Sequence, residues 1–199
     1  MLPLAPLRIL LVAPILFSAF YFLAIGALLF IRATPLMVRA TLIAWIITTV
    51  TAPLIVATLV FYFSTSDPAV CILLALPALI IFGIWRSTQG YVVIGVTEAD
   101  LRASLQAALD GVGLPYEESI LGFALISLQD NLRVRMSAPL GTAQFQMSSP
   151  GHSQELAQIA QGVRDYLHRY AEANLATALL FGTAGLVCLV LAIYRGGRF

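Results

Sequence analysis

The chain has 199 residues, of which 60% are hydrophobic and 11% charged, with a mean hydropathy of +0.92. This composition excludes a soluble globular domain and predicts an integral membrane protein. The formal net charge of +1 carries little information, but nine of the ten acids fall between Glu98 and Glu172. We therefore expect this interval to face water.

Four segments are predicted to cross a membrane, which takes about 20 apolar residues in a helix. None of them contains a charged side chain, and they cover 9–31, 40–63, 69–85 and 175–194. The first is interpreted as a retained helix, because its apolar run is longer than the core of a secretory signal. The chain thus divides into a three-helix transmembrane region (1–86), a water-facing domain (87–172) and a fourth helix with a C-terminal tail (173–199).

The second predicted span carries a stripe of small and weakly polar side chains at helical spacing. Its members are Thr41, Ala44, Thr48, Thr51, Ala52 and Thr58. Small residues let helix backbones approach closely in a bilayer, so the stripe predicts an association face, with a pore lining as the alternative. The sequence leaves open whether the other helix belongs to this chain or to another protein.

The water-facing interval predicts a small α+β domain. Its expected elements are a strand at 91–96, a helix from Thr97 to a stop at Gly111 and Gly113, strands at 120–129 and 132–137 around a two-residue turn at Asp130 and Asn131, a strand at 143–148, and a closing helix from Ser153. Alternating apolar residues indicate the strands, and Thr97 and Ser153 are typical helix caps. The order β-α-β-β-β-α favours a ferredoxin-like packing with both helices on one face of the sheet.

Two arginines in the strand at 132–137 are candidate interaction residues. Arg133 and Arg135 alternate with Leu132, Val134 and Met136, so both are expected on the exposed face of the sheet. The surrounding domain has nine acids and five arginines, a net charge of −4. The pair is suited to a partner's acids or to lipid phosphates, and the alternative is an ordinary solvated sheet face.

The closing helix runs toward the last span without an intervening proline or glycine at the change from polar to apolar. The stretch after Tyr170 consists mostly of good helix formers. We therefore predict one continuous helix over 153–194, with a local bend permitted at Asn174. Such a helix would mount the domain rigidly on its last span.

Catalytic and metal-binding signatures are absent from the sequence. The two histidines, His152 and His168, lie outside the predicted spans, and no zinc spacing, phosphate loop or nucleophile elbow occurs. The acids of PYEES (115–119) predict a solvated turn more readily than a metal site. Cys71 and Cys188 are expected at similar membrane depth, either as a disulfide or as two small buried side chains. We expect no cofactor and no enzymatic activity.

The function expected from these features is that of a membrane accessory, assembly or scaffold protein. Its predicted partners are lipid and another membrane protein or complex, and no nucleic acid. A signalling or gating protein whose domain moves the last span is the alternative, followed by a small-solute transporter. The arginines on the domain side favour a cytoplasmic domain over an external one by the positive-inside rule. Those arginines are Arg32, Arg39, Arg86, Arg164 and Arg169, against Arg8, Arg195 and Arg198 on the opposite side.

Overall fold

The computed structural model describes residues 4–49, 51–52, 79, 82–83, 85, 89–119, 122–149 and 151–197. The chain forms two compact units. The first comprises Met1–Ile25, Thr41–Thr88 and Phe181–Phe199, and the second comprises Gly26–Ala40 and Gln89–Leu180. The second unit contains the water-facing interval together with the end of the first helix and the start of the last.

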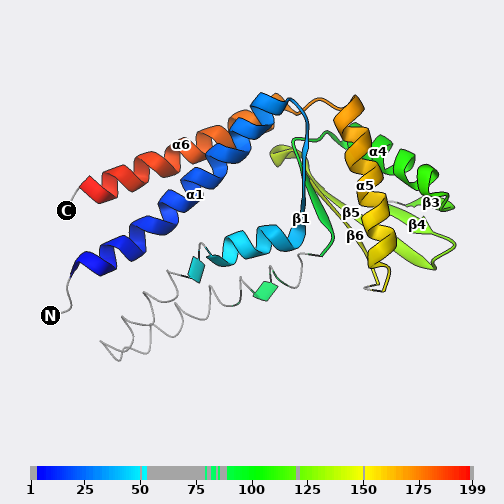
Figure 1. Cartoon of the computed structure of the whole chain (residues 1–199), viewed down its shortest axis with the longest axis horizontal. Helices are drawn as coiled ribbons and strands as arrows, with labels where there is room; N and C mark the ends of the chain where they lie inside the picture. Colours follow the sequence, from blue (N-terminus) through cyan, green and yellow to red (C-terminus); the bar gives the residue numbers. More distant parts are fainter. Residues whose placement is uncertain are drawn as a thin grey trace. The chain divides into compact units, whose positions relative to one another are not determined.

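A six-stranded, fully antiparallel sheet is the framework of the second unit (Figure 1). Its strands follow the order β1-β2-β6-β5-β4-β3. They span Leu36–Arg39 (β1), Tyr91–Ile94 (β2), Tyr116–Ser119 (β3), Gly122–Leu125 (β4), Asp130–Ser137 (β5) and Thr142–Met147 (β6), with a 3-10 turn η1 at Ala138–Leu140. Because four antiparallel pairings separate them, β2 and β3 run in the same direction at distant positions in the sheet.

Helices α4 (Glu98–Val112) and α5 (Ser153–Tyr170) cover one face of this sheet (Figure 1). Both send a buried apolar stripe into the core, with Leu105 on α4 and Ile159 on α5 at 0% exposure. The predicted limits of α4 are confirmed: the Thr97 hydroxyl accepts the Asp100 N–H, and Gly113 closes the helix in the left-handed conformation. The other face of the sheet carries no helix among the described residues of this unit.

The predicted fold of four transmembrane helices and a ferredoxin-like β-α-β-β-β-α domain is wrong. The sheet has two strands more than expected, β1 and β3. The first was hidden because its four residues lie between two apolar helical segments, and only pairing with β2 makes them a strand. The second was read as a solvated turn because an edge strand tolerates the exposed Glu117 and Glu118. The turn before β5 is also longer than predicted, since it occupies residues 126–129 and Asp130 already pairs with Leu125.

Two helices in the described part of the chain are long and apolar enough to cross a membrane. They lie within α1 (Leu4–Arg32) and α6 (Leu175–Gly197), at Pro14–Arg32 and Leu175–Tyr194. Of the second predicted span, Ala40–Thr49 forms a shorter apolar helix and residues 51–52 are helical. The rest of it, and nearly all of the third, lie outside the described residues. By length and composition, two helices of the described residues are therefore candidate membrane spans. This finding corrects the prediction of four transmembrane helices.

The prediction of one continuous helix over 153–194 is also wrong. Helix α5 ends at Tyr170, Ala171 is extended (φ −106, ψ 135), and α6 begins at Leu175. Asn174 starts the new helix, because its side-chain oxygen accepts the Ala176 N–H at 3.0 Å and its carbonyl accepts the Ala178 N–H at 3.2 Å. Asparagine is among the strongest N-cap residues, so it separates two helices here instead of bending one.

A close crossing of α4 and α5 depends on Gly162. A Cβ atom at this position would lie 2.9 Å from the Ala108 Cβ, whereas one at Gly111 would meet nothing within 4 Å. We expect Gly162→Ala to destabilise the domain by about 1 to 2 kcal/mol through overpacking. Gly111→Ala should instead stabilise it by up to about 1 kcal/mol through helix propensity. Thermal unfolding of the full chain in detergent checks this, and shifts of the same sign for both variants would contradict the crossing.

Candidate functional site

The exposed face of the sheet carries the two arginines predicted as interaction residues. Arg133 and Arg135 are both exposed on β5. Leu132, the residue before Arg133 on the same strand, is fully buried in the core under the helices. Across β6 the two arginines face Gln146 and Gln144. The predicted orientation is therefore confirmed, and the role of the pair in binding stays a prediction.

A hollow of about 170 Å³ adjoins Arg133 on this face. Three polar side chains border it: Arg133 and Asn131 from β5 and Ser119 from β3. Gly122 at the start of β4 also lines it. At its φ of +142 a Cβ would overlap the Leu132 carbonyl oxygen, so only glycine fits. A guanidinium, an amide and a hydroxyl around one hollow suit a carboxylate or phosphate group.

Two hydroxyl groups of the threonine stripe form hydrogen bonds within this chain. The Thr48 and Thr51 hydroxyls donate to the carbonyls of Ala44 and Ile47, each at 2.8 Å. The Thr48 oxygen also accepts a hydrogen bond from the Trp85 ring nitrogen at 2.9 Å. Ala44 is fully buried, whereas Thr41 is exposed, and Thr58 lies outside the described residues. The stripe thus contacts residue 85 of its own chain, and its association with another protein stays a prediction.

A hydrogen-bonded junction joins both candidate spans to the sheet, and sequence reasoning missed it. We define the junction as Leu29, Ala33, Gly95, Gly141, Ala173, Asn174 and Thr177. The Ala173 N–H donates to the Ala33 carbonyl just after α1, at 2.8 Å, and the Asn174 N–H donates to the Gly95 carbonyl after β2, at 2.9 Å. The four residues between α5 and α6 therefore connect α1, the sheet and α6.

Close packing at two glycines completes the junction. Gly95 (φ +84) lies against Leu29, whose Cδ2 would be 2.7 Å from an added Cβ. Gly141 (φ +55) lies against Thr177 on α6, and an added Cβ would overlap the threonine oxygen. The two glycines are themselves linked, because the Gly95 N–H donates to the Gly141 carbonyl at 2.8 Å. The sequence carried no signal for this junction, because the positive φ of Gly95 and Gly141 is not visible in a sequence.

This chain matches no protein-family model, no curated protein and no solved structure.

The remaining sequence candidates form no reactive constellation in the described residues. No group of three or more His, Cys, Asp or Glu side chains there is placed to hold a metal ion. His152 lies 3.9 Å from Glu155, and His168 is exposed on α5. Cys188 lies in α6 and has no disulfide partner among the described residues, while Cys71 lies outside them, so the disulfide stays a prediction.

The two glutamates of β3 are exposed on an edge strand of the sheet. Glu118 forms an ion pair with Arg102 at 3.0 Å, and Glu117 points to the exposed face. Burial raises the pKa of the neighbouring Tyr116 phenol above its ordinary value, and the Asp110 carboxylate raises it further. Its ring packs edge-on against Phe123, with the ring centroids 5.5 Å apart, so the tyrosine has a structural place at the edge of the core.

Proposed function

We propose that this chain is a non-enzymatic accessory or scaffold protein of a membrane complex, anchored by α1 and α6. The sheet domain then lies at the membrane surface and presents its exposed face to an acidic partner. The observation that carries this proposal is the exposure of both apolar helices. Only 28% and 22% of their apolar stretches are buried.

Apolar helices with this exposure need a non-aqueous environment. A core helix of a soluble protein would be mostly buried, but here large side chains such as Phe20 (73% exposed) and Ile193 (65%) lie open. Together with their neighbours they exceed the apolar patches that soluble monomers tolerate. A bilayer accommodates such helices, because every backbone group is bonded within the helix.

Packing between α1 and α6 supports a membrane pair. Gly185 on α6 is buried against Leu23 and the Ala19 carbonyl of α1, and the Phe22 and Phe181 rings are 5.9 Å apart. Small residues at a helix contact are typical of association in lipid. The end of α1 and the start of α6 also meet at the junction, so the two helices run in opposite directions.

A cytoplasmic domain is part of the proposal. Arg32 and Arg39 flank the domain end of α1, and Arg164 and Arg169 add positive charge shortly before α6. These outnumber the arginines at the opposite ends under the positive-inside rule. A Ser137→Cys probe in a Cys71→Ser/Cys188→Ser background tests the side. An impermeant maleimide should label intact cells only after permeabilisation, and prompt labelling would place the domain outside.

Loss of the exposed arginines should release the partner. We expect Arg133→Gln/Arg135→Gln to lower recovery of a stoichiometric partner in mild detergent by at least about tenfold, because charge-assisted contacts are lost. The matched control is Arg164→Gln/Arg169→Gln, which removes the same charge from α5. Quantitative mass spectrometry of the purified full chain compares them. A stable monomer in several detergents, or equal loss in both variants, would contradict the proposal.

The signalling alternative has less support. It required a continuous helix from the domain into the last span, and α5 and α6 are separate helices. A domain movement would have to pass through the junction, whose hydrogen bonds connect the sheet to α1 as well as to α6.

A further inference from the structure

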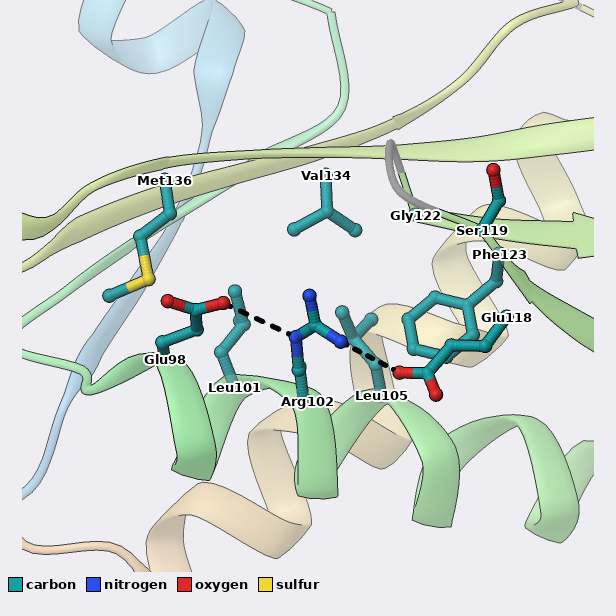
Figure 2. A pocket seen from close by; sticks show the side chains of 10 residues that line it. All are labelled: Glu98, Leu101, Arg102, Leu105, Glu118, Ser119, Gly122, Phe123, Val134 and Met136. Carbon is teal, nitrogen blue, oxygen red and sulfur yellow. Dashed lines mark hydrogen bonds and ion pairs between the residues drawn. The ribbon is translucent and has the colours of Figure 1, made fainter.

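A second hollow lies on the opposite side of the sheet edge, between α4 and the strands (Figure 2). Its volume is about 190 Å³. The floor is apolar, and its side chains are Leu101, Leu105, Phe123, Val134 and Met136. The rim is charged, with Glu98 and Arg102 from α4 and Glu118 from β3. The hollow is smaller than the pockets of about 300 Å³ or more that hold whole small molecules, and it suits a single side chain.

Strand β5 lines the hollow beyond its described pairing with β4. Among the described residues, that pairing runs from Asp130 opposite Leu125 to Arg133 opposite Gly122. Beyond it, Val134 and Met136 point from the strand toward α4, which runs along the bottom of the view (Figure 2). These two side chains form the sheet side of the apolar floor.

The charge of the rim is negative. The Arg102 guanidinium lies between two carboxylates, with its Nε 3.4 Å from Glu98 and its Nη1 3.0 Å from Glu118. One cation between two acids leaves a net charge of −1. The acidic side chains are also accessible, since 66% of Glu98 and 46% of Glu118 is exposed.

This rim is the centre of the domain's acidity. Helix α4 and strand β3 carry five acids and one arginine, which equals the full net charge of −4 between residues 87 and 172. The remaining four acids and four arginines of that interval balance. The field around the hollow therefore attracts cations, while the exposed sheet face around Arg133 attracts anions.

We propose that the hollow receives a lysine or arginine side chain of a partner protein. Its aliphatic stem would lie on the apolar floor, because long basic side chains bury their stems and keep their heads at a polar rim. Its charged head would meet the Oε2 atom of Glu98 or Glu118, since the Oε1 atom of each already pairs with Arg102. An anion is disfavoured by the net negative rim. A purely apolar side chain would leave the carboxylates without a new partner. Its charged residues differ from Arg133 and Arg135 of the exposed arginine face, so substitutions can remove either binding site separately.

Methionine methyl resonances test the site in the full chain in nanodiscs. The chain has four methionines, of which Met136 lines the hollow and Met147 is buried in the core. The probe is the peptide acetyl-Ser-Val-Arg-Val-Ser-amide, with norleucine in place of arginine as its control. We expect the arginine peptide to shift the Met136 methyl and to leave Met147 unchanged. The norleucine peptide should bind at least about tenfold more weakly.

Two double variants distinguish binding by the rim carboxylates from a general effect of the domain's negative charge. Glu98→Gln/Glu118→Gln should weaken the arginine peptide at least about tenfold. Asp110→Asn/Glu117→Gln removes equal charge elsewhere on α4 and β3 and should weaken it far less. The proposal is overturned by equal binding of both peptides, by equal effects of both variants, or by a Met136 shift with spermidine but not with the arginine peptide.

Discussion

Gly141→Val is expected to destabilise the sheet domain by about 2 to 5 kcal/mol and to open the junction. The residue has φ +55, where a β-branched side chain is strained by about 1 to 2 kcal/mol. Its new Cβ would overlap the Thr177 oxygen and lie 3.1 Å from the Thr177 Cβ, which adds about 1 to 3 kcal/mol of overpacking. Thermal unfolding of the full chain in detergent should show a midpoint at least about 8 °C lower.

Two controls isolate the contact between Gly141 and Thr177. Gly113→Val has a similar φ of +71 but meets nothing within 4 Å, so it should show only the backbone strain. Thr177→Ala added to Gly141→Ala should restore part of the lost stability, because it removes the overlapping oxygen. Hydrogen exchange at the Ala173 and Asn174 amides should accelerate in Gly141→Val. Equal destabilisation at positions 113 and 141, or no rescue by Thr177→Ala, would contradict the junction.

Gly185→Leu should separate α1 from α6. An added Cβ would lie 2.7 Å from the Leu23 Cγ, 2.8 Å from the Leu23 backbone nitrogen and 3.0 Å from the Ala19 carbonyl oxygen. Backbone atoms cannot rotate away as a side-chain end can, so the helices must move apart. We expect a loss of about 2 to 3 kcal/mol in helix association. Gly182→Leu is the matched control on the same helix, since a Cβ there meets nothing within 4 Å.

Cross-linking measures this separation directly. Phe22→Cys and Phe181→Cys, in a Cys71→Ser/Cys188→Ser background, place two thiols where the aromatic rings are 5.9 Å apart. A short bis-maleimide should join them in membranes. The intramolecular yield should fall at least about tenfold with Gly185→Leu and stay unchanged with Gly182→Leu. Equal yields in the two variants would mean that α1 and α6 do not pack through Gly185.

The two surfaces of the domain have opposite charge, and this has a consequence for assembly. The hollow beside Arg133 and the hollow beside Arg102 share the lining residues Ser119, Gly122 and Phe123. A partner that reaches over this one edge of the sheet can therefore place an acid on one side and a base on the other. Such paired opposite charges fix the register of an interface more strongly than they raise its affinity.

Local sequence patterns determined much of this protein. Composition alone identified the apolar stretches of α1 and α6, because a run of uncharged apolar residues is a local property. The caps of α4 at Thr97 and Gly113 were also readable, since each acts on backbone groups within a few residues. Alternation placed Arg133 and Arg135 on the exposed face, because side chains in a strand alternate with a period of two.

Contacts between distant segments decided the rest. Residues 36–39 become a strand only because β2 offers hydrogen-bonding partners, and the polar β3 is a strand because it pairs with β4. The helix breaks after Tyr170 although its residues favour continuation, because the Ala173 and Asn174 amides find acceptors at Ala33 and Gly95. Helix propensity amounts to a few tenths of a kcal/mol per residue, and tertiary hydrogen bonds outweigh it. Only the tertiary structure could therefore show that the domain is held by a junction of several segments instead of by one helix.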